Sequence, residues 1–237
     1  MPSKPKWLFD ETKHAGVDYN DPAQVQVYDA RHQEFRNYEK DSEAIIERIK
    51  LEPHQTLIDL GTGTGAFALH AARRCKKVYA VDVSKPMLEW ASRKAEKAGI
   101  DNIDFLHGGF LTYEHNEEPA DAIVSVFALH HLPDFWKLTG LRRAAAMLKS
   151  GGKFYLFDVV FSFDPADYES HLNNWVRSLR ADAGPEMAEE TEEHIRNEYS
   201  TFSWIMEELL EKSGFTIERA EYQDVYLAWY LCVKNKG

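Results

Sequence analysis

Residues 56–65, TLIDLGTGTG, join a short apolar run to a loop with glycine at 61, 63 and 65. The run 56–60 is typical of a buried strand, and residues 65–75 have the pattern of a helix. Glycines let the backbone turn tightly and approach a ligand, and a helix start offers unpaired N–H groups with partial positive charge. The stretch therefore predicts a site for a nucleotide or for a carboxylate-bearing ligand such as an amino acid.

An acidic residue at the end of the next predicted strand supports this interpretation. That strand spans residues 77–82, and Asp82 lies 21 residues after Gly61. A carboxylate there can accept hydrogen bonds from both hydroxyls of a ribose. A structural Gly-rich turn without a ligand is the simpler alternative, but the strand, the helix and the acid agree on ligand binding.

The identity of the nucleotide depends on the residue just before the loop. Gly61, Gly63 and Ala66 also satisfy the fingerprint of NAD-binding proteins. Asp59, however, would face a pyrophosphate and repel it, whereas it would attract the ammonium group of a ligand. An NAD-dependent reductase therefore stays only as the least favoured alternative.

The rest of the core alternates strands and helices. Ser84 is a good N-cap and Gly99 a good stop for a helix over 85–98. Continuous apolar strands separated by helices predict a parallel sheet covered on both faces. The last two strands are joined by so short a link that they must be antiparallel, and the final one, apolar on both faces, should lie inside the sheet. The further strands are expected at 103–107, 121–127, 153–160, 215–222 and 226–234, with a helix at 134–148.

We expect one domain over residues 1–237, built around a cofactor-binding core at 51–160. Residues 1–50 are predicted to form an N-terminal helical cap. Residues 161–200 are too long for a plain loop and predict a helical insertion over the carboxyl edge of the sheet. Residues 201–237 supply a helix at 201–213 and the closing strand pair.

Composition narrows the class of protein. The chain has 237 residues, and 28 Lys and Arg against 39 Asp and Glu give a net charge of −11. Such a surface repels phosphate backbones, so nucleic acid is not expected as a partner. Cys75 and Cys232 show no metal-ligand spacing and are expected to be reduced thiols in the cytoplasm. No membrane span is expected, because no apolar run approaches about 18 residues. No secretory signal and no metal site are expected either.

Taken together, four segments resemble the motifs of the class I S-adenosylmethionine-dependent methyltransferases. The resemblance implies S-adenosyl-L-methionine as cofactor and S-adenosyl-L-homocysteine as product. It also implies an α/β, Rossmann-like, doubly wound seven-stranded sheet of order 3-2-1-4-5-7-6, with strand 7 antiparallel. The segments are IDLGTGTG (58–65), VYAVDVSKPMLEWA (78–91), DAIVSVFALHHLPD (121–134) and MLKSGGKFYLFD (147–158).

The same resemblance implies which residues contact the cofactor. Asp82 would bind the ribose and Met87 would lie near the adenine. The sequence departs from the family at Gly109, where many relatives carry an acid that contacts the adenine amino group. Backbone atoms of Gly109 and Phe110 are candidates to replace that acid. The full expected set is Asp59, Gly61, Thr62, Gly63, Gly65, Asp82, Val83, Met87, Gly109, Phe110 and Phe127.

Residues that touch the acceptor are harder to choose. His130 and His131 follow a strand at the carboxyl edge of the sheet, where ligands bind in such folds. One of them is a candidate general base or acceptor-orienting group. Alternatively, His131 packs near the cofactor and His130 caps the next helix. Besides His131, the candidate acceptor-pocket residues are Tyr19, Tyr28, Phe161 and Trp175, although each also fits ordinary packing.

The favoured hypothesis is methyl transfer to a small-molecule acceptor by in-line displacement. Holding donor and acceptor in line can supply about 7–11 kcal/mol, and a base is needed only if the nucleophile keeps a proton. One alternative is an enzyme that modifies the sulfonium cofactor itself, similar to carboxy-S-adenosylmethionine synthase. Another is a non-catalytic regulator that binds the cofactor. A homodimer is also possible.

Overall fold

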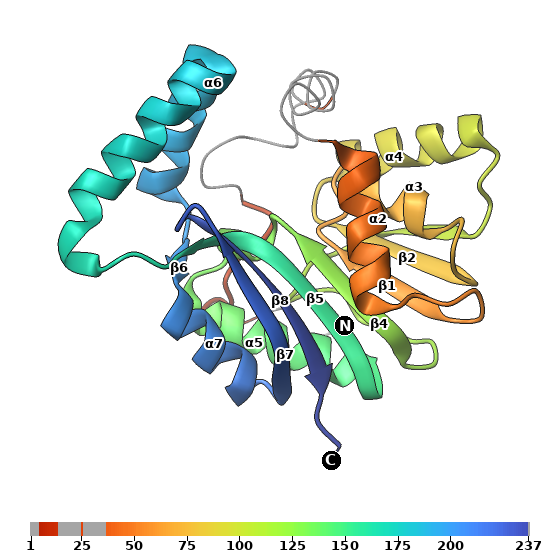
Figure 1. Ribbon diagram of the computed structural model, residues 1–237. Coiled ribbons are helices and arrows are strands. Elements are labelled where there is room, and N and C mark those ends of the chain that lie inside the picture. Colours follow the sequence, from red (N-terminus) through yellow and green to blue (C-terminus); the bar gives the residue numbers. More distant parts are fainter. Residues whose placement is uncertain (1–4, 14–24, 26–36, 237) are drawn as a thin grey trace.

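The computed structural model describes residues 5–13, 25 and 37–236. Within these residues a twisted sheet is covered by helices on both faces (Figure 1). Tyr19 and Tyr28, two of the candidate pocket residues, lie outside the described residues.

The sheet has the order β3-β2-β1-β4-β5-β8-β7. The pairs among the first five strands are parallel, and β8 is antiparallel to both of its neighbours. This is the order predicted from the sequence, with β7 and β8 in the places of predicted strands 6 and 7. The bounds are β1 Thr56–Leu60, β2 Lys77–Asp82, β3 Ile103–His107, β4 Ala120–Val126, β5 Leu148–Phe161, β7 Phe215–Gln223 and β8 Leu227–Lys234.

One short strand was not predicted and shifts the numbering. Thr201–Phe202 form β6, which pairs with Val160 and Phe161 at the end of β5. The helix expected from residue 201 therefore begins later, as α7 Ser203–Lys212. The sheet has eight strands rather than seven, because backbone groups at the end of the long β5 are available to pair with the returning chain.

The helices of the core mostly match the predicted ones. The exception is α3, which was expected over 65–75 and ends at Ala71. The chain must turn there, because the Lys76 amide already donates to the Gln55 carbonyl as β2 begins. The bounds are α2 Tyr38–Ile49, α3 Ala66–Ala71, α4 Lys85–Ala98 and α5 Asp134–Met147.

The core lies on both faces of the sheet, and β8 contributes to each. Trp229 packs in the cluster beneath α2 and α3, whereas its neighbour Tyr230 packs in the cluster with α5 and α7. The Arg48 guanidinium of α2 lies 4.2 Å from the centre of the Trp229 ring and donates to the Tyr155 hydroxyl. The prediction that the last strand is inserted inside the sheet is thereby confirmed.

Residues 161–200 form the predicted helical insertion. Its main element is α6 Tyr168–Asn197, preceded by the short turn η2 Pro165–Asp167. The helical path breaks at Gly184, whose φ of 88° and ψ of 174° are not helical, just before Pro185. Figure 1 shows α6 projecting from the sheet on the side of β6 and α7. Among the described residues, none of the helices has the length and apolar content needed to cross a bilayer.

The burial of β5 predicts that two phenylalanines differ greatly in how much they stabilise the fold. Phe154 is fully buried with its ring stacked 5.0 Å from that of Phe215, whereas Phe135 of α5 is 70% exposed. We expect Phe154→Ala to lower the free energy of unfolding by about 3–5 kcal/mol, and Phe135→Ala by about 0.5 kcal/mol or less. Urea denaturation followed by circular dichroism measures both, and equal losses would contradict this account of the core.

Candidate functional site

The glycine loop after β1 is pressed against the carboxyl ends of the neighbouring strands. The amides of Gly61 and Thr62 both donate to the Val81 carbonyl of β2. Gly61 has a φ of +78°, and a Cβ added there would lie only 2.2 Å from the Cβ of Ala128, in the segment after β4. Only glycine lets the loop pass this close, so the loop has the tight path that the sequence predicted.

Asp82 fixes the loop from the end of β2. Its Oδ2 accepts a hydrogen bond of 2.8 Å from the Gly63 amide, and its Oδ1 accepts one of 2.8 Å from the Ser84 amide. A carboxylate has about four acceptor sites, so Asp82 keeps the capacity to accept from ligand hydroxyls. Asp82 therefore both holds the loop in place and lines the site.

Asp59 provides a second carboxyl group, and the pKa of this group is raised. It is buried, and burial raises its pKa to about 7, against the opposing effect of the 2.6 Å hydrogen bond donated by the Thr62 hydroxyl. The negative charge of Asp82 adds to the rise. A cationic ligand group beside Asp59 would favour its ionised form.

These groups meet in one pocket formed by six regions: the N-terminal segment, α2, and the segments that follow β1, β2, β3 and β4. Ten of the eleven predicted cofactor residues line it; the other, Gly65, precedes α3, and a Cβ added there would lie 2.9 Å from the Ala91 Cβ. The lining residues are Glu11, Lys13, Tyr38, Asp41, Ser42, Ile45, Asp59, Gly61, Thr62, Gly63, Thr64, Ala66, Phe67, Asp82, Val83, Met87, Gly108, Gly109, Phe110, Val126, Phe127, Ala128, His131 and Leu132.

Glu11 is a site residue that the sequence analysis missed. Its carboxylate accepts hydrogen bonds from the Leu111 amide at 3.0 and 3.1 Å and from the Thr112 hydroxyl at 2.6 Å. A Cβ added at Gly109 would lie 2.6 Å from the Glu11 Oε2, so glycine at 109 makes room for this carboxylate. Burial raises the pKa of Glu11. The only signal in the sequence was the missing acid at position 109.

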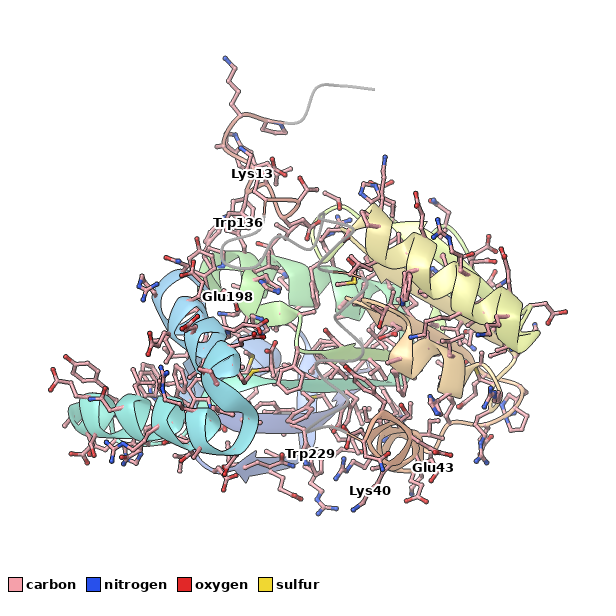
Figure 2. All side chains as sticks on the ribbon, turned by 90° about the horizontal axis from the view of Figure 1, so that it is seen from above. Lys13, Lys40, Glu43, Trp136, Glu198 and Trp229 are labelled. Carbon is pink, nitrogen blue, oxygen red and sulfur yellow. The ribbon has the colours of Figure 1, made fainter. Side chains whose placement is uncertain are left out.

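Aromatic contacts hold the segment that carries Glu11. The ring of Trp7 stacks on that of Trp136 with centroids 6.4 Å apart, and Phe9 lies 6.3 Å from both Trp136 and Tyr199. Figure 2 shows the segment that ends at Lys13 beside Trp136. The N-terminal segment is thus attached to α5 and to the chain that follows α6.

The two candidate histidines occupy different places. They lie in the short turn η1 Leu129–His131, and of the two only His131 lines the pocket. His130 is buried behind it, with its amide 3.1 Å from Asp158 Oδ2, its Nδ1 2.5 Å from Asp158 Oδ1 and its Nε2 3.2 Å from Glu198 Oε2. Its side chain therefore does not cap α5, which begins without a side-chain cap.

The charge state of His130 follows from those two carboxylates. Burial alone would lower the pKa of the imidazole, but Asp158 and Glu198 outweigh burial and raise it to about 10. The pKa of Asp158 is lowered in return, mainly by the charge of His130 acting against burial.

Phe161 and Trp175 lie in an aromatic cluster outside the pocket lining. Their ring centroids are 6.1 Å apart, and Trp175 stacks on Tyr226 at 5.0 Å. The cluster connects α6 to the end of β5 and to the turn before β8. Both residues therefore attach the insertion to the sheet.

Comparison with known proteins identifies a methyltransferase domain in this chain. A family model described as a methyltransferase domain matches residues 57–152. An uncharacterized methyltransferase of Geobacillus kaustophilus is 28% identical over 198 residues, which cover 83% of this chain and 84% of that protein. The chain thus carries a methyltransferase domain, and these matches support a class I S-adenosylmethionine-dependent methyltransferase. S-adenosylmethionine is the cofactor of this methyltransferase family.

Solved structures agree on the fold. A SAM-dependent methyltransferase from Aquifex aeolicus superposes with a TM-score of 0.64 at 21% identity and covers 90% of this chain and 98% of its own. One from Clostridium acetobutylicum gives a TM-score of 0.68 at 14% identity with the same coverage. The [4+2]-cyclase SpnF gives 0.66 at 17% identity over 84% of this chain and 81% of its own. The fold therefore hosts more than one chemistry, and the methyltransferase's substrate has to be argued from its site.

The residues present fit the cofactor of the family. S-adenosylmethionine carries ribose hydroxyls, an ammonium group and an adenine, and the pocket offers acceptors for each in Asp82, Asp59 and Glu11. A Cβ added at Gly63 would meet nothing within 4 Å, so the loop leaves open space on its pocket side.

The close approach of the loop to Ala128 separates two glycine substitutions. Gly61→Ala and Gly63→Ala both place a side chain at positive φ, but only the first meets another Cβ. We expect Gly63→Ala to cost about 1 kcal/mol of unfolding free energy and Gly61→Ala about 1–3 kcal/mol more. Chemical denaturation of the two variants side by side tests this, and losses of the same size would show that Ala128 moves away freely.

Proposed function

We propose that this methyltransferase transfers the methyl group of S-adenosylmethionine to a small-molecule acceptor by in-line displacement in the pocket after β1. The proposal rests on one observation: Asp59 and Asp82, from the ends of the adjacent strands β1 and β2, bring two carboxyl groups to the lining of one pocket. One group suits paired hydroxyls and the other suits an ammonium ion.

Each part of the cofactor then has a place along the pocket. Asp82 accepts from the ribose hydroxyls, and Asp59 faces the ammonium group. Met87 and Phe110 pack on the adenine at the end where Glu11 lies. Phe127 and His131, which both follow β4, also line the pocket. The bound cofactor supplies an activated methyl group, and the chain's own residues hold it, orient it and exclude water.

His131 is the residue of this set that we assign to the acceptor side. It lines the pocket, and His130 behind it is fixed by Asp158 and Glu198. His131 would orient the acceptor, or take its proton where the nucleophile still carries one. Phe161, Trp175, Tyr19 and Tyr28 stay as predictions for the acceptor side, although Phe161 and Trp175 would have to reach it from outside the lining described above.

The small size of the acceptor is supported by charge and by enclosure. The net charge of −11 disfavours a polyanionic acceptor such as a nucleic acid. Glu11 and Lys13 of the N-terminal segment add to the lining of the pocket, and a partly enclosed pocket of this kind favours a small molecule as acceptor. We further propose that residues 1–237 work as one cytoplasmic domain, which agrees with the buried free thiols of Cys75 and Cys232.

The first test is calorimetric titration with S-adenosylhomocysteine, with NADH as the control ligand. We expect S-adenosylhomocysteine to bind and NADH not to bind. Asp82→Asn should weaken S-adenosylhomocysteine about 10- to 100-fold, because hydrogen bonds to a charged acceptor contribute about 1.5–3 kcal/mol. Asp104→Asn is the matched control, since Asp104 lies on β3 outside the pocket and pairs with Lys77.

Two results would contradict the proposal. NADH binding without S-adenosylhomocysteine binding would favour a reductase. An equal loss of affinity in Asp82→Asn and Asp104→Asn would remove Asp82 from the site. A heavier, modified sulfonium found by mass spectrometry after turnover would instead point to chemistry on the cofactor itself.

Glu11 generates a second expectation about the same ligand. We propose that its carboxylate accepts from the adenine amino group, in place of the acid missing at Gly109. Glu11→Gln should then weaken S-adenosylhomocysteine about 10-fold, yet leave nearly unchanged the affinity for S-inosylhomocysteine, which carries an oxygen in place of that amino group. Glu114→Gln, an exposed neighbour, should affect neither ligand.

Position 109 provides the reciprocal variant. Gly109→Asp alone should weaken binding, because its side chain would meet the Glu11 carboxylate and the Val83 side chain. In the background Glu11→Ala, the same aspartate should recover part of the affinity for S-adenosylhomocysteine. Failure of Gly109→Asp to recover any affinity, together with a Glu11→Gln variant that weakens both ligands equally, would show that Glu11 only supports the loop.

A further inference from the structure

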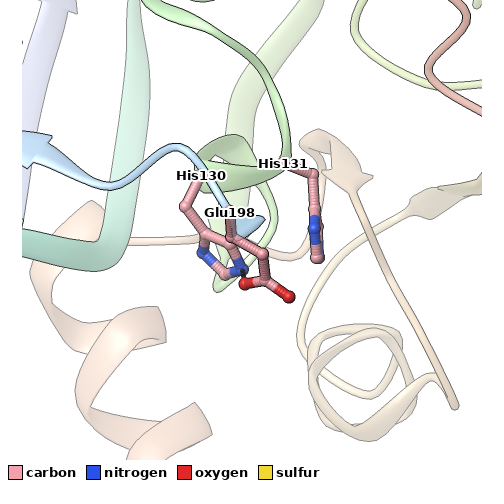
Figure 3. A group of neighbouring side chains, drawn as sticks. All are labelled: His130, His131 and Glu198. Carbon is pink, nitrogen blue, oxygen red and sulfur yellow. Dashed lines mark ion pairs between the residues drawn. The ribbon is translucent and has the colours of Figure 1, made fainter. Parts of the chain in front are cut away.

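A group of imidazoles surrounds one buried carboxylate beside the pocket wall. The Nε2 of His130 and the Nδ1 of His194 both contact the same oxygen of Glu198, Oε2. His131 lies next to them, with its ring centroid 4.3 Å from that of His130 (Figure 3). His194 and Glu198 come from the end of α6, one helical turn apart, whereas His130 and His131 come from η1 after β4.

The spacing suits a single metal ion. Candidate ligand atoms of His130, His131 and Glu198 all lie within 4.8 Å of one another. Two ligands at about 2.0–2.1 Å from a tetrahedral zinc ion stand about 3.3 Å apart. The observed 3.2 Å between His130 Nε2 and Glu198 Oε2 matches that separation. Small side-chain movements would therefore bring the group into a coordination shell.

The outer hydrogen bonds are those that metal-binding histidines usually have. Asp158 Oδ1 lies 2.5 Å from His130 Nδ1, the ring nitrogen that faces away from Glu198. Ser200 Oγ lies 2.7 Å from His194 Nε2, again on the far side of the ring. A carboxylate or hydroxyl in this position fixes the ring and makes its other nitrogen a better ligand.

Ion pairing alone does not account for the arrangement, because two imidazole nitrogens, His130 Nε2 and His194 Nδ1, face the same oxygen of the single carboxylate of Glu198. A divalent ion at this point would replace protons between those nitrogens and Glu198 and would satisfy all of them together.

We propose that His130, His131, His194 and Glu198 bind one divalent transition-metal ion, with zinc as the expected metal. Imidazole nitrogens with a carboxylate oxygen suit zinc, whereas magnesium and calcium prefer oxygen ligands throughout. The site joins η1 to the end of α6, so the ion also ties the insertion to the sheet.

The place of the ion gives it a further role. His131 belongs both to this group and to the lining of the pocket, so the ion lies at the pocket wall. Binding of an anionic donor atom of the acceptor, such as a thiolate or phenolate, would expand the shell from four ligands to five, as zinc sites can do. This second step rests on the proposed function, whereas binding of the ion does not.

The test uses the full chain without a polyhistidine tag, stripped with a chelator and titrated with Co²⁺. We expect one Co²⁺ per chain, with the visible absorption bands of a tetrahedral nitrogen–oxygen site, and displacement of Co²⁺ by Zn²⁺. Glu198→Gln and His194→Ala should each weaken Co²⁺ at least 10-fold. His171→Ala removes another histidine of α6, one that stacks on Phe163 outside the group, and should bind Co²⁺ as the parent does.

Folding is controlled separately. Circular dichroism and S-adenosylhomocysteine titration should show that the variants, once stripped of metal by the chelator, keep the fold and the cofactor site. Should Glu198→Gln fail to fold, Ser200→Ala alters only the outer hydrogen bond of His194 and should weaken Co²⁺ about 10-fold.

Two outcomes would overturn the metal site. One is the lack of tetrahedral bands and of stoichiometric binding in the parent chain, which would leave a network of ion pairs. The other is binding that is unchanged in both Glu198→Gln and His194→Ala. Neither outcome touches the proposed function, which is judged by S-adenosylhomocysteine affinity. If the parent chain binds Co²⁺ but does not bind S-adenosylhomocysteine, only the cofactor assignment is overturned.

Discussion

The site depends on the carboxylate of Asp82, which links the end of β2 to the loop that follows β1. By accepting from the amides of Gly63 and Ser84, it joins the loop after β1 to the start of α4. The Val81 carbonyl adds two hydrogen bonds to the same loop. These bonds fix the path of the loop along the pocket, which Asp82 and the loop residues Gly61, Thr62 and Gly63 line.

A second set of buried charges positions the insertion. Lys137 of α5 is fully buried, and its ammonium donates to Asp134 and to the Tyr199 carbonyl. Burial lowers the pKa of Lys137, but Asp134 and Asp158 favour its charged form. With His130 and Glu198 beside them, these groups attach the end of α6 to α5 and β5. Isolated charges are costly to bury, so such a set specifies one docking geometry for the insertion.

Elements with strong local signals were predicted close to their observed bounds. Helix α4 begins after Ser84, whose hydroxyl accepts from the Met87 amide, and ends at Gly99 in a left-handed conformation, as the sequence indicated. The order of the sheet was also predicted. Strand β6 and the early end of α3 were not predicted. Both depend on hydrogen bonds to backbone groups far away in the sequence, and no local pattern carries that information.

The sequence by itself determined the strand–glycine loop–helix unit, the carboxyl group at the end of β2 and hence the place of the pocket. Those features follow from backbone conformation and hydrophobic periodicity within short segments. Only the tertiary structure decided that Glu11 fills the space left by Gly109, and that His130, Asp158 and Glu198 share one buried cluster. These partners are separated along the chain and come together only when the sheet, η1 and α6 are packed. Their chemistry therefore arises from proximity that no stretch of sequence encodes alone.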